Sequence, residues 1–279
     1  MRSLLGGPAA AIVLGAASAA AAAPSVEINH AVVRVIVSPE PRNDVRVEVV
    51  KANPRLPLHV WSFAGRTYVD GGLGGMRLRG CHGTVDQPGA VVAGLGEISA
   101  EAMPQIVVHT PMNARVSAGG AVWGQVGRTE ALDLANAGCG DWEVANVRGK
   151  LRISVAGSGT VRAGQAGAAE LVTAGSGSIH THEISGPVMA MAVGSGDISL
   201  GAVNGPFNAR VAGVGRVSAA GGHVTAMQAS IAGAGDIDFD GVADSLKASI
   251  VGSGDVRVAR VSGAVNRAVI GSGAVRVGS

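Results

Sequence analysis

Apolar and polar residues alternate with a period of two around a recurring pair of glycines, and this is the period of a β-strand. Before the glycines of one copy, the apolar positions are Leu246, Ala248 and Ile250. After the same glycines, they are Val256 and Val258. The residues between these positions are mostly polar and are expected to face water, as on a half-buried sheet. The alternation therefore predicts two or three short strands for each copy of the glycine pair.

The glycine pairs form an internal repeat. Eight segments of the form Gly-x-Gly-x begin 19, 18, 19, 19, 20, 19 and 19 residues apart. Their first residues are Gly138, Gly157, Gly175, Gly194, Gly213, Gly233, Gly252 and Gly271. Fainter copies at Gly72 and Gly94 extend the pattern towards the N-terminus with less regular spacing. A fixed period of this length over so many copies is typical of a solenoid.

We interpret the repeat as a single-stranded parallel β-helix, an all-β fold in which each rung of about 19 residues adds strands to the sheets below. Glycine suits the corners because it adopts a positive φ without penalty and because neighbouring backbones crowd there. With rungs about 4.8 Å apart, the clear copies predict a rod on the order of 40 Å long, too slim inside for a cofactor. A helical fold is disfavoured because each glycine costs a helix about 1 kcal/mol relative to alanine.

The repeat is expected to fill residues 71–279, after an irregular N-terminal β cap at residues 24–70, and the two parts form one continuous domain. The strand candidates and aromatic residues of the cap are 26–37, 45–50, Trp61, Phe63 and Tyr68. An uncovered first rung would offer unpaired N–H and C=O groups to other chains. We therefore expect the bulky aromatic side chains of the cap to cover it.

Residues 1–23 have the three-part pattern of a secretory signal peptide, with Arg2, an apolar stretch and small residues that end at Ala23. The strongly apolar part is shorter than the roughly 18 residues that a membrane span needs, so cleavage is favoured over a retained anchor. The sequence predicts an exported protein, periplasmic or extracellular, with no transmembrane span after signal cleavage.

The composition limits both the interior and the partners. Phe, Trp and Tyr number only seven, so the core is expected to consist largely of Ala, Val, Ile and Leu. The net charge of +2 is too balanced for a nucleic-acid binder that neutralises many phosphates. A hydrophobic content of 47% with so little net charge argues against a disordered chain.

An acidic row at Asp236, Asp238 and Asp240 is the main metal candidate. Its carboxylates alternate along one predicted strand, and Asp255 is expected one rung away from Asp236. Oxygen-rich clusters suit calcium, the one cofactor that the sequence suggests. The alternative, which we favour, is a solvated strand face whose charge Arg257 balances, because the nine-residue calcium solenoid motif is absent from the sequence.

A weaker metal candidate is formed by His180, His182 and Glu183, which lie close together in the sequence. The positions expected beside them in neighbouring rungs supply no third ligand of the kind that a zinc site needs. We therefore interpret these residues as exposed and polar.

Cys81 and Cys139 are the only cysteines, and an exported protein meets an oxidising compartment in which such a pair can bridge. Cys139 lies in a glycine corner, whereas Cys81 lies several rungs earlier, so a bridge requires the segment around Cys81 to fold back along the rod. We expect a disulfide, and two separate thiols are the alternative.

Two features suggest contact surfaces. Met189, Met191 and Val193 occupy outward positions where other rungs carry polar residues, and they form either a partner surface or ordinary surface variation. Arg267 occupies the stacked position that Ala248 holds in the preceding rung, and a charge belongs there only where water reaches it. We therefore expect an open C-terminal rung and predict a homo-oligomer that forms end to end through it.

With its Gly-Ser-Gly-Asp corners at Gly194 and Gly252, its leader and its valine-rich opening, the chain resembles the GIN-domain family, described as autotransporter adhesin head domains, over about residues 26–279. The resemblance implies a right-handed parallel β-helix that bacteria export, with an adhesive or surface role. It transfers no catalytic residues, because the family offers no established ones.

We therefore expect an exported, non-enzymatic cell-envelope protein that presents rigid β-helical faces for adhesion or scaffolding to an envelope component or a surface glycan. Repetition supplies avidity more readily than chemistry. The alternative is a β-helix that binds or cleaves polysaccharide with calcium at the acidic row. The scarcity of aromatic residues along the rungs counts against sugar stacking.

Overall fold

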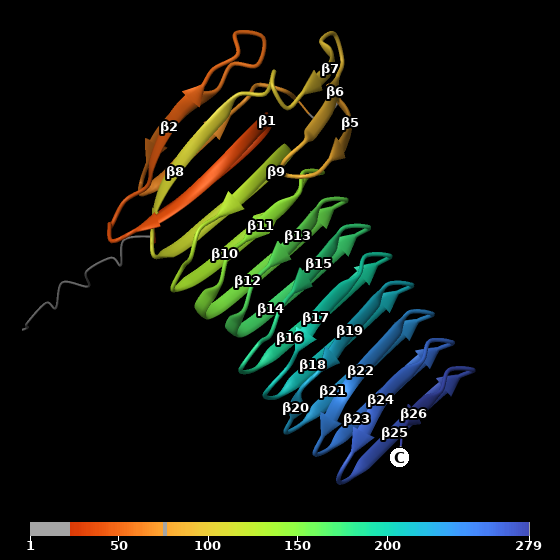
Figure 1. Cartoon of the computed structure of the whole chain (residues 1–279). Helices are drawn as coiled ribbons and strands as arrows, with labels where there is room; N and C mark the ends of the chain where they lie inside the picture. Colours follow the sequence, from red (N-terminus) through yellow and green to blue (C-terminus); the bar gives the residue numbers. More distant parts are fainter. Residues whose placement is uncertain (1–22, 75–76, 279) are drawn as a thin grey trace, which may run out of the picture.

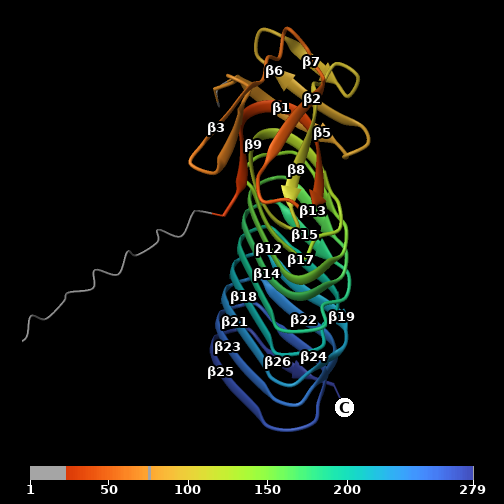
Figure 2. The same cartoon turned by 90° about the vertical axis from the view of Figure 1, so that its left-hand side faces the viewer.

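The structure is a computed structural model that describes residues 23–74 and 77–278, and every regular element in this part of the chain is a β-strand. The expected signal peptide lies outside the described residues except for Ala23. From residue 131 onwards the chain winds into stacked coils, each of which contributes a strand to each of two parallel sheets (Figures 1 and 2).

Paired residues of neighbouring coils are mostly 19 positions apart, as Ile231 and Ile250 are. The strands of the first sheet are β10 (Ala131–Asn136), β12 (Val147–Gly157), β14 (Ala166–Gly175), β16 (Val188–Gly194), β18 (Phe207–Gly213), β21 (Met227–Gly233), β23 (Leu246–Gly252) and β25 (Val265–Gly271). Those of the second sheet are β11 (Trp142–Val144), β13 (Thr160–Ala163), β15 (Ser178–Thr181), β17 (Ile198–Ala202), β19 (Arg216–Gly221), β22 (Asp236–Ala243), β24 (Val256–Val261) and β26 (Val275–Val277), and the short β20 (His223–Val224) also pairs with β22. The predicted all-β solenoid is confirmed.

Two long strands begin the solenoid. β1 (Ser25–Glu40) and β9 (Asn113–Val126) pair in parallel, and each is long enough to take part in both sheets. The first half of β1 then pairs with β4 (Arg66–Asp70) and its second half with β8 (Gln105–Pro111). The outermost strands at this end are β3 (His59–Phe63) on β4 and β2 (Arg46–Lys51) on β8, both antiparallel.

Residues 78–99 form a separate three-stranded antiparallel sheet, which we call the flap. Its strands are β5 (Leu78–Gly83), β6 (Pro88–Val92) and β7 (Gly96–Ser99). Gly94 and Gly96 have φ values of 81° and 76° and lie at the connection between β6 and β7. The expectation that the fainter copy at Gly94 marks a further rung is therefore wrong, because a hairpin turn uses the same residue for the same positive φ.

The corner glycines have two roles, a positive φ and a close approach between backbones of neighbouring coils. Gly252 has a φ of 134°, which side-chain-bearing residues rarely adopt. A Cβ atom on Gly254 would collide with the carbonyl oxygen of Gly235 in the preceding coil. This corner therefore needs one glycine for its dihedral angle and one for the close approach of two backbones.

The core holds more aromatic side chains than the composition suggested. Columns of Ile, Leu, Val and Ala fill it, but Trp142, Phe207 and Phe239 are also at most 1% exposed inside the coils. Trp123 is equally buried, in a second cluster between the flap and the solenoid. Gly124 leaves space for the ring of Trp142, because a Cβ atom on Gly124 would collide with that ring.

The aromatic side chains of the N-terminal region are more exposed than we expected. Phe63 is 74% exposed and Trp61 is 48% exposed, and Trp61 stacks on Tyr68 with ring centroids 5.3 Å apart. These side chains do not bury themselves over the first coil, as the cap interpretation required. This end of the solenoid is instead extended by hydrogen-bonded strands, because backbone pairing satisfies the polar groups of β1 better than a ring could.

Candidate functional site

Carboxylates at the glycine corners connect each coil to the next. The aspartate that follows the second glycine accepts, through Oδ1, a hydrogen bond from the backbone N–H of the corresponding residue one coil later. The pairs are Asp141 with Thr160 (2.9 Å), Asp197 with Arg216 (2.9 Å), Asp236 with Asp255 (3.1 Å) and Asp255 with Ala274 (3.0 Å). The Gly-x-Gly-Asp signature is therefore a structural device that fixes the start of the following strand.

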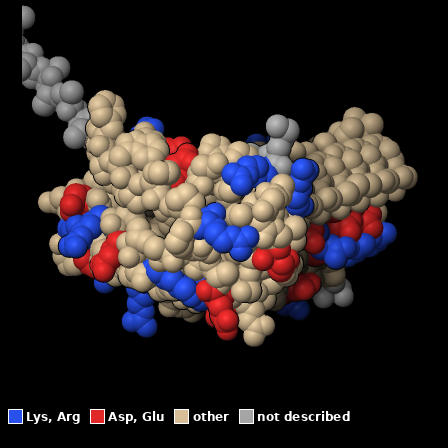
Figure 3. Space-filling model, turned by 90° about the horizontal axis from the view of Figure 1, so that it is seen from above, with Lys and Arg blue, Asp and Glu red and all other residues tan. Residues whose placement is uncertain are grey.

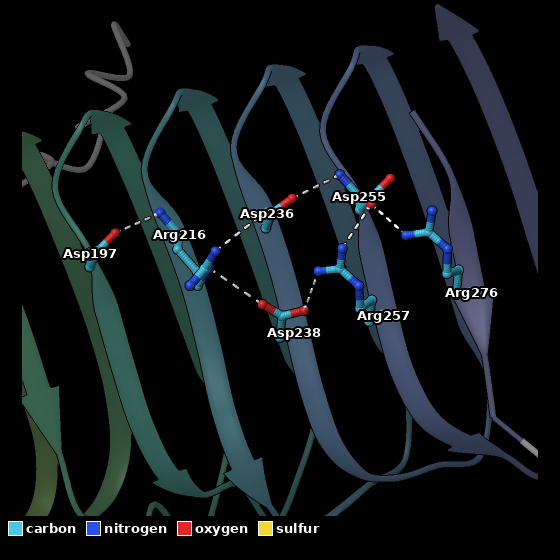
Figure 4. Close-up of polar contacts among 7 residues, drawn as sticks. All are labelled: Asp197, Arg216, Asp236, Asp238, Asp255, Arg257 and Arg276. Atoms are coloured by element: carbon cyan, nitrogen blue, oxygen red, sulfur yellow. Dashed lines mark hydrogen bonds and ion pairs between the residues drawn. The ribbon is translucent and has the colours of Figure 1, made fainter. Parts of the chain in front are cut away.

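Arginines on the second sheet turn these carboxylates into a continuous network, drawn in Figure 4. We call it the Asp–Arg ladder, and its members are Asp197, Arg216, Asp236, Asp238, Asp255, Arg257 and Arg276. Arg216 contacts Asp236 at 3.1 Å and Asp238 at 3.5 Å. Arg257 contacts Asp238 at 3.1 Å and Asp255 at 2.8 Å, and Arg276 also pairs with Asp255. Ion pairs between acidic and basic side chains thus link the coils of Arg216, Asp236, Asp255 and Arg276.

Contacts within the Asp–Arg ladder shift the pKa values of Asp255 and Arg257. The hydrogen bond from Arg276 is the main cause that lowers the pKa of Asp255, and the backbone N–H of Ala274 and the charge of Arg257 act in the same direction. The hydrogen bond to Asp238 is the main cause that raises the pKa of Arg257. Both groups are thereby held in their charged forms.

Three of the four carboxylates of the calcium candidate belong to this ladder. Asp236, Asp238 and Asp255 lie together, as expected, but their oxygens are bonded to arginines and backbone amides. Asp240 is exposed and drops out of register, because an irregularity between Phe239 and Val242 shifts the pairing of β22 with β24. Within residues 23–74 and 77–278, no group of three or more His, Cys, Asp or Glu side chains is arranged to hold a metal ion.

The histidine candidate does not assemble either. His180 lies on β15 beside Arg162 of the preceding coil, and burial is the main cause that lowers its pKa, followed by the charge of Arg162. His182 is exposed beyond the end of the strand, and Glu183 accepts a hydrogen bond from Asn204 at 3.0 Å. These residues are thus polar surface groups in the structure.

Cys81 of β5 and Cys139 of the first corner are joined in a disulfide, with their Cα atoms 5.8 Å apart. The flap folds back along the rod, as a bridge requires. Both cysteines pack at the edge of the cluster that contains Trp123 and Met103. The disulfide therefore ties the flap to a corner of the solenoid.

The methionine candidate lies on the outer face of β16. Met189 and Val193 are each 40% exposed, and Met191 is half-buried between Val172 and Arg210 of the neighbouring coils. Met189 also lines a shallow groove of about 500 Å³ together with Phe207. The structure thus places the three residues together on one outer face, beside a partly apolar hollow.

The structure has a second groove that was not predicted from the sequence. It has a volume of about 640 Å³ and is lined by residues that include Thr129, Glu130, Arg148 and Glu183. It lies where the pairing of β12 with β14 changes register between Val147 and Lys150. The single 18-residue spacing in the repeat, from Gly157 to Gly175, is the sequence signal of this change of register.

Charge on the N-terminal end of the molecule is mixed. Seen from this end, basic and acidic side chains lie close together among uncharged atoms (Figure 3). A large field of a single sign would steer an oppositely charged partner, and interspersed charges do not create one.

Comparisons with known proteins bear on the coils. None of the described elements is a helix long and apolar enough to cross a membrane. A search of curated proteins finds no match to this chain. Residues 163–263, which run from the end of β13 to just beyond β24, match the family model described as "Putative auto-transporter adhesin, head GIN domain", and the resemblance to the GIN-domain family is thereby confirmed for these coils.

Proposed function

We propose that this chain is an exported, non-enzymatic protein of the cell envelope that works by adhesion or scaffolding. The family match supports an adhesin-like role, and the predicted signal peptide supports export. The surface that carries the proposal is a row of uncharged residues on the first sheet, next to the glycine corners.

We call this row the corner column. All its members are exposed, and each pairs with the next across neighbouring coils. Its members are Ala156, Ala174, Val193, Ala212, Ala232, Val251 and Ile270. Apolar groups that recur at the strand spacing of about 4.8 Å can contact an extended partner many times at once, so weak single contacts add up to avidity.

The methionine surface widens this row at one point. Met189 and Met191 lie on the same strand as Val193, and flexible methionine side chains adapt to partners of different shape. The Asp–Arg ladder on the second sheet has its charges mostly engaged within the chain. Contact with an envelope component or a surface glycan is therefore proposed for the first sheet.

The test is co-sedimentation of residues 24–279 with intact cells, outer membranes and isolated cell-wall sacculi, with and without a calcium chelator. Saturable binding to one fraction is expected, and Val193→Lys should weaken it because the new charge interrupts the corner column. Val91→Lys is the matched control, since Val91 is 37% exposed on the flap. Wild-type protein that binds no fraction would contradict the proposal.

Binding that the chelator abolishes would instead favour the alternative, a calcium-assisted polysaccharide-binding or polysaccharide-cleaving β-helix. Turnover of uronate polymers that is lost in Asp236→Ala would displace the non-enzymatic reading altogether. The groove beside Arg148 is the hollow in which an extended polar ligand would then be sought.

A further inference from the structure

Both ends of the solenoid expose open strand edges. Among the described residues, β25 pairs only with β23 and β26 only with β24, at the end marked C in Figure 1. At the other end, within residues 23–74 and 77–278, β3 pairs only with β4 and β2 only with β8. Edge strands of this kind present unpaired N–H and C=O groups that another strand can complete.

The open edges at the two ends belong to the same two sheets. The first sheet starts with β3, continues through β4, β1 and β9, and ends with β25. The second sheet starts with β2, continues through β8, β1 and β9, and ends with β26. Stacking one copy on another along the rod would therefore bring β25 to β3 and β26 to β2.

Apolar side chains are incompletely covered at both ends. Val269 is 41% exposed, whereas Ile250, its neighbour in the same column one coil earlier, is fully buried. Val60 of β3 is 40% exposed and pairs with the fully buried Val69. Each end thus exposes the apolar position that a further coil would bury, and burial of apolar area favours association.

Charges at the two ends permit this arrangement. The last two coils carry five basic residues and one acidic residue, Asp255; the basic residues are Lys247, Arg257, Arg260, Arg267 and Arg276. Two copies that met through their C-terminal ends would therefore bring like charges together. The N-terminal edge strand β2 carries Glu48, whose side chain is 55% exposed, between Arg46 and Lys51. A mixed end is a better partner for a basic end than a second basic end.

We propose that copies of this chain associate head to tail, with β25 and β26 of one copy added to β3 and β2 of the next. Because β3 and β2 run opposite to the strands they pair with, the new pairings are antiparallel, which gives the more stable ladder. The contact is heterologous and does not close on itself, so it produces linear chains of copies rather than dimers.

The test measures mass against concentration by sedimentation equilibrium for residues 24–279 and three variants. Val60→Lys blocks the N-terminal edge, and Val269→Lys blocks the C-terminal edge. Both positions are about two-fifths exposed, so the lysine can reach water without disrupting the coil. Val214→Lys, at a corner in the middle of the rod and 66% exposed, is the matched control, and the far-UV circular dichroism of every variant reports folding.

The wild type and Val214→Lys are expected to grow beyond dimers as the concentration rises. Val60→Lys and Val269→Lys should each stay monomeric, and their equimolar mixture should form dimers only, because each supplies the one edge that the other has lost. Ile270→Lys, at 72% exposure on the same strand, repeats the C-terminal block if Val269→Lys unfolds. A monomeric wild type, growth of either blocked variant alone, or failure of the mixture to pair would each overturn the proposal.

Discussion

The Oδ1 atom of Asp236 accepts a hydrogen bond from the backbone N–H of Asp255 at 3.1 Å. Asp255 in turn accepts one from the backbone N–H of Ala274 in the following coil. A side chain at one corner thus fixes the backbone at the next. This relationship explains why aspartate follows the glycine pair in several coils, and it gives the first prediction.

Replacing Asp236 with alanine should lower the free energy of unfolding by about 1 kcal/mol, the scale of a partly exposed hydrogen bond to a charged acceptor. Asn at the same position keeps an acceptor and should lose less. Urea denaturation followed by circular dichroism measures both values. Asp240→Ala is the control, because Asp240 lies outside the ladder, and an equal loss there would contradict the role of the corner.

Calcium should leave the melting temperature of the protein nearly unchanged at millimolar concentration. The carboxylates of Asp236, Asp238 and Asp255 already bind arginines and backbone amides, which calcium would have to displace. Differential scanning calorimetry with calcium and with chelator provides the measurement. A calcium-dependent rise that disappears in Asp238→Asn would instead establish the acidic row as a metal site.

Acid should weaken the C-terminal coils through Asp255. Its pKa is lower in the folded chain than in the unfolded chain, chiefly because of the hydrogen bond from Arg276. The unfolded state therefore takes up protons first, so this stabilisation is complete at neutral pH and is lost as the pH falls below about 4, the ordinary pKa of aspartate.

Arg276→Gln should consequently melt at a lower temperature than the wild type at pH 7 and at nearly the same temperature once Asp255 is protonated. Arg260→Gln removes a charge from the same coil outside the ladder and serves as the control. A difference between the wild type and Arg276→Gln that is independent of pH would show that the ion pair is not its source.

Loss of the Cys81–Cys139 disulfide should release the flap while the coils stay folded. A bridge that closes a loop of 58 residues typically contributes about 2–4 kcal/mol. Hydrogen exchange in Cys139→Ser is expected to speed up in residues 78–99 and to stay slow in the coils after residue 150. Ser158→Ala, in the next corner, is the control, and unchanged exchange in the flap would contradict the prediction.

Arg267→Ala should tighten head-to-tail association. Arg267 is exposed and pairs in register with Ala248, and Ala229 and Ala209 precede it in the same inward column. An inward charge discourages strand addition at an edge, so its removal should lower the dissociation constant by about tenfold or more. Sedimentation equilibrium gives the constant, Arg260→Ala is the control, and weaker association of Arg267→Ala would refute the prediction.

Much of the solenoid could be predicted because coil spacing, strand alternation and corner glycines are local and recur. The prediction failed at Gly94, where one positive-φ glycine serves a hairpin and imitates a corner. Burial of Trp123 and Trp142 was also missed. It depends on space that Gly124 and the flap create, and these contacts join residues whose proximity no period reveals.

The candidate sites divide in the same way. Asp236 and Asp255 were expected one coil apart, and their pairing follows from the 19-residue period. The displacement of Asp240 was not foreseeable, because it comes from a register irregularity after Phe239. The fold-back of Cys81 onto Cys139 likewise depends on the flap, which the repeat does not encode.

The placement of β1 has a consequence for the order in which the chain acquires structure. β1 is completed by β9, whose residues follow it by about 90 positions, and by β4 and β8 on its other side. Closing such a long loop is slow compared with adding a coil of 19 residues to an existing edge. A chain emerging N-terminus first therefore has no template until residue 126 is free, after which each further coil can form on the one before it. The solenoid therefore gains its order in one direction only, from the N-terminal strands towards the last coil.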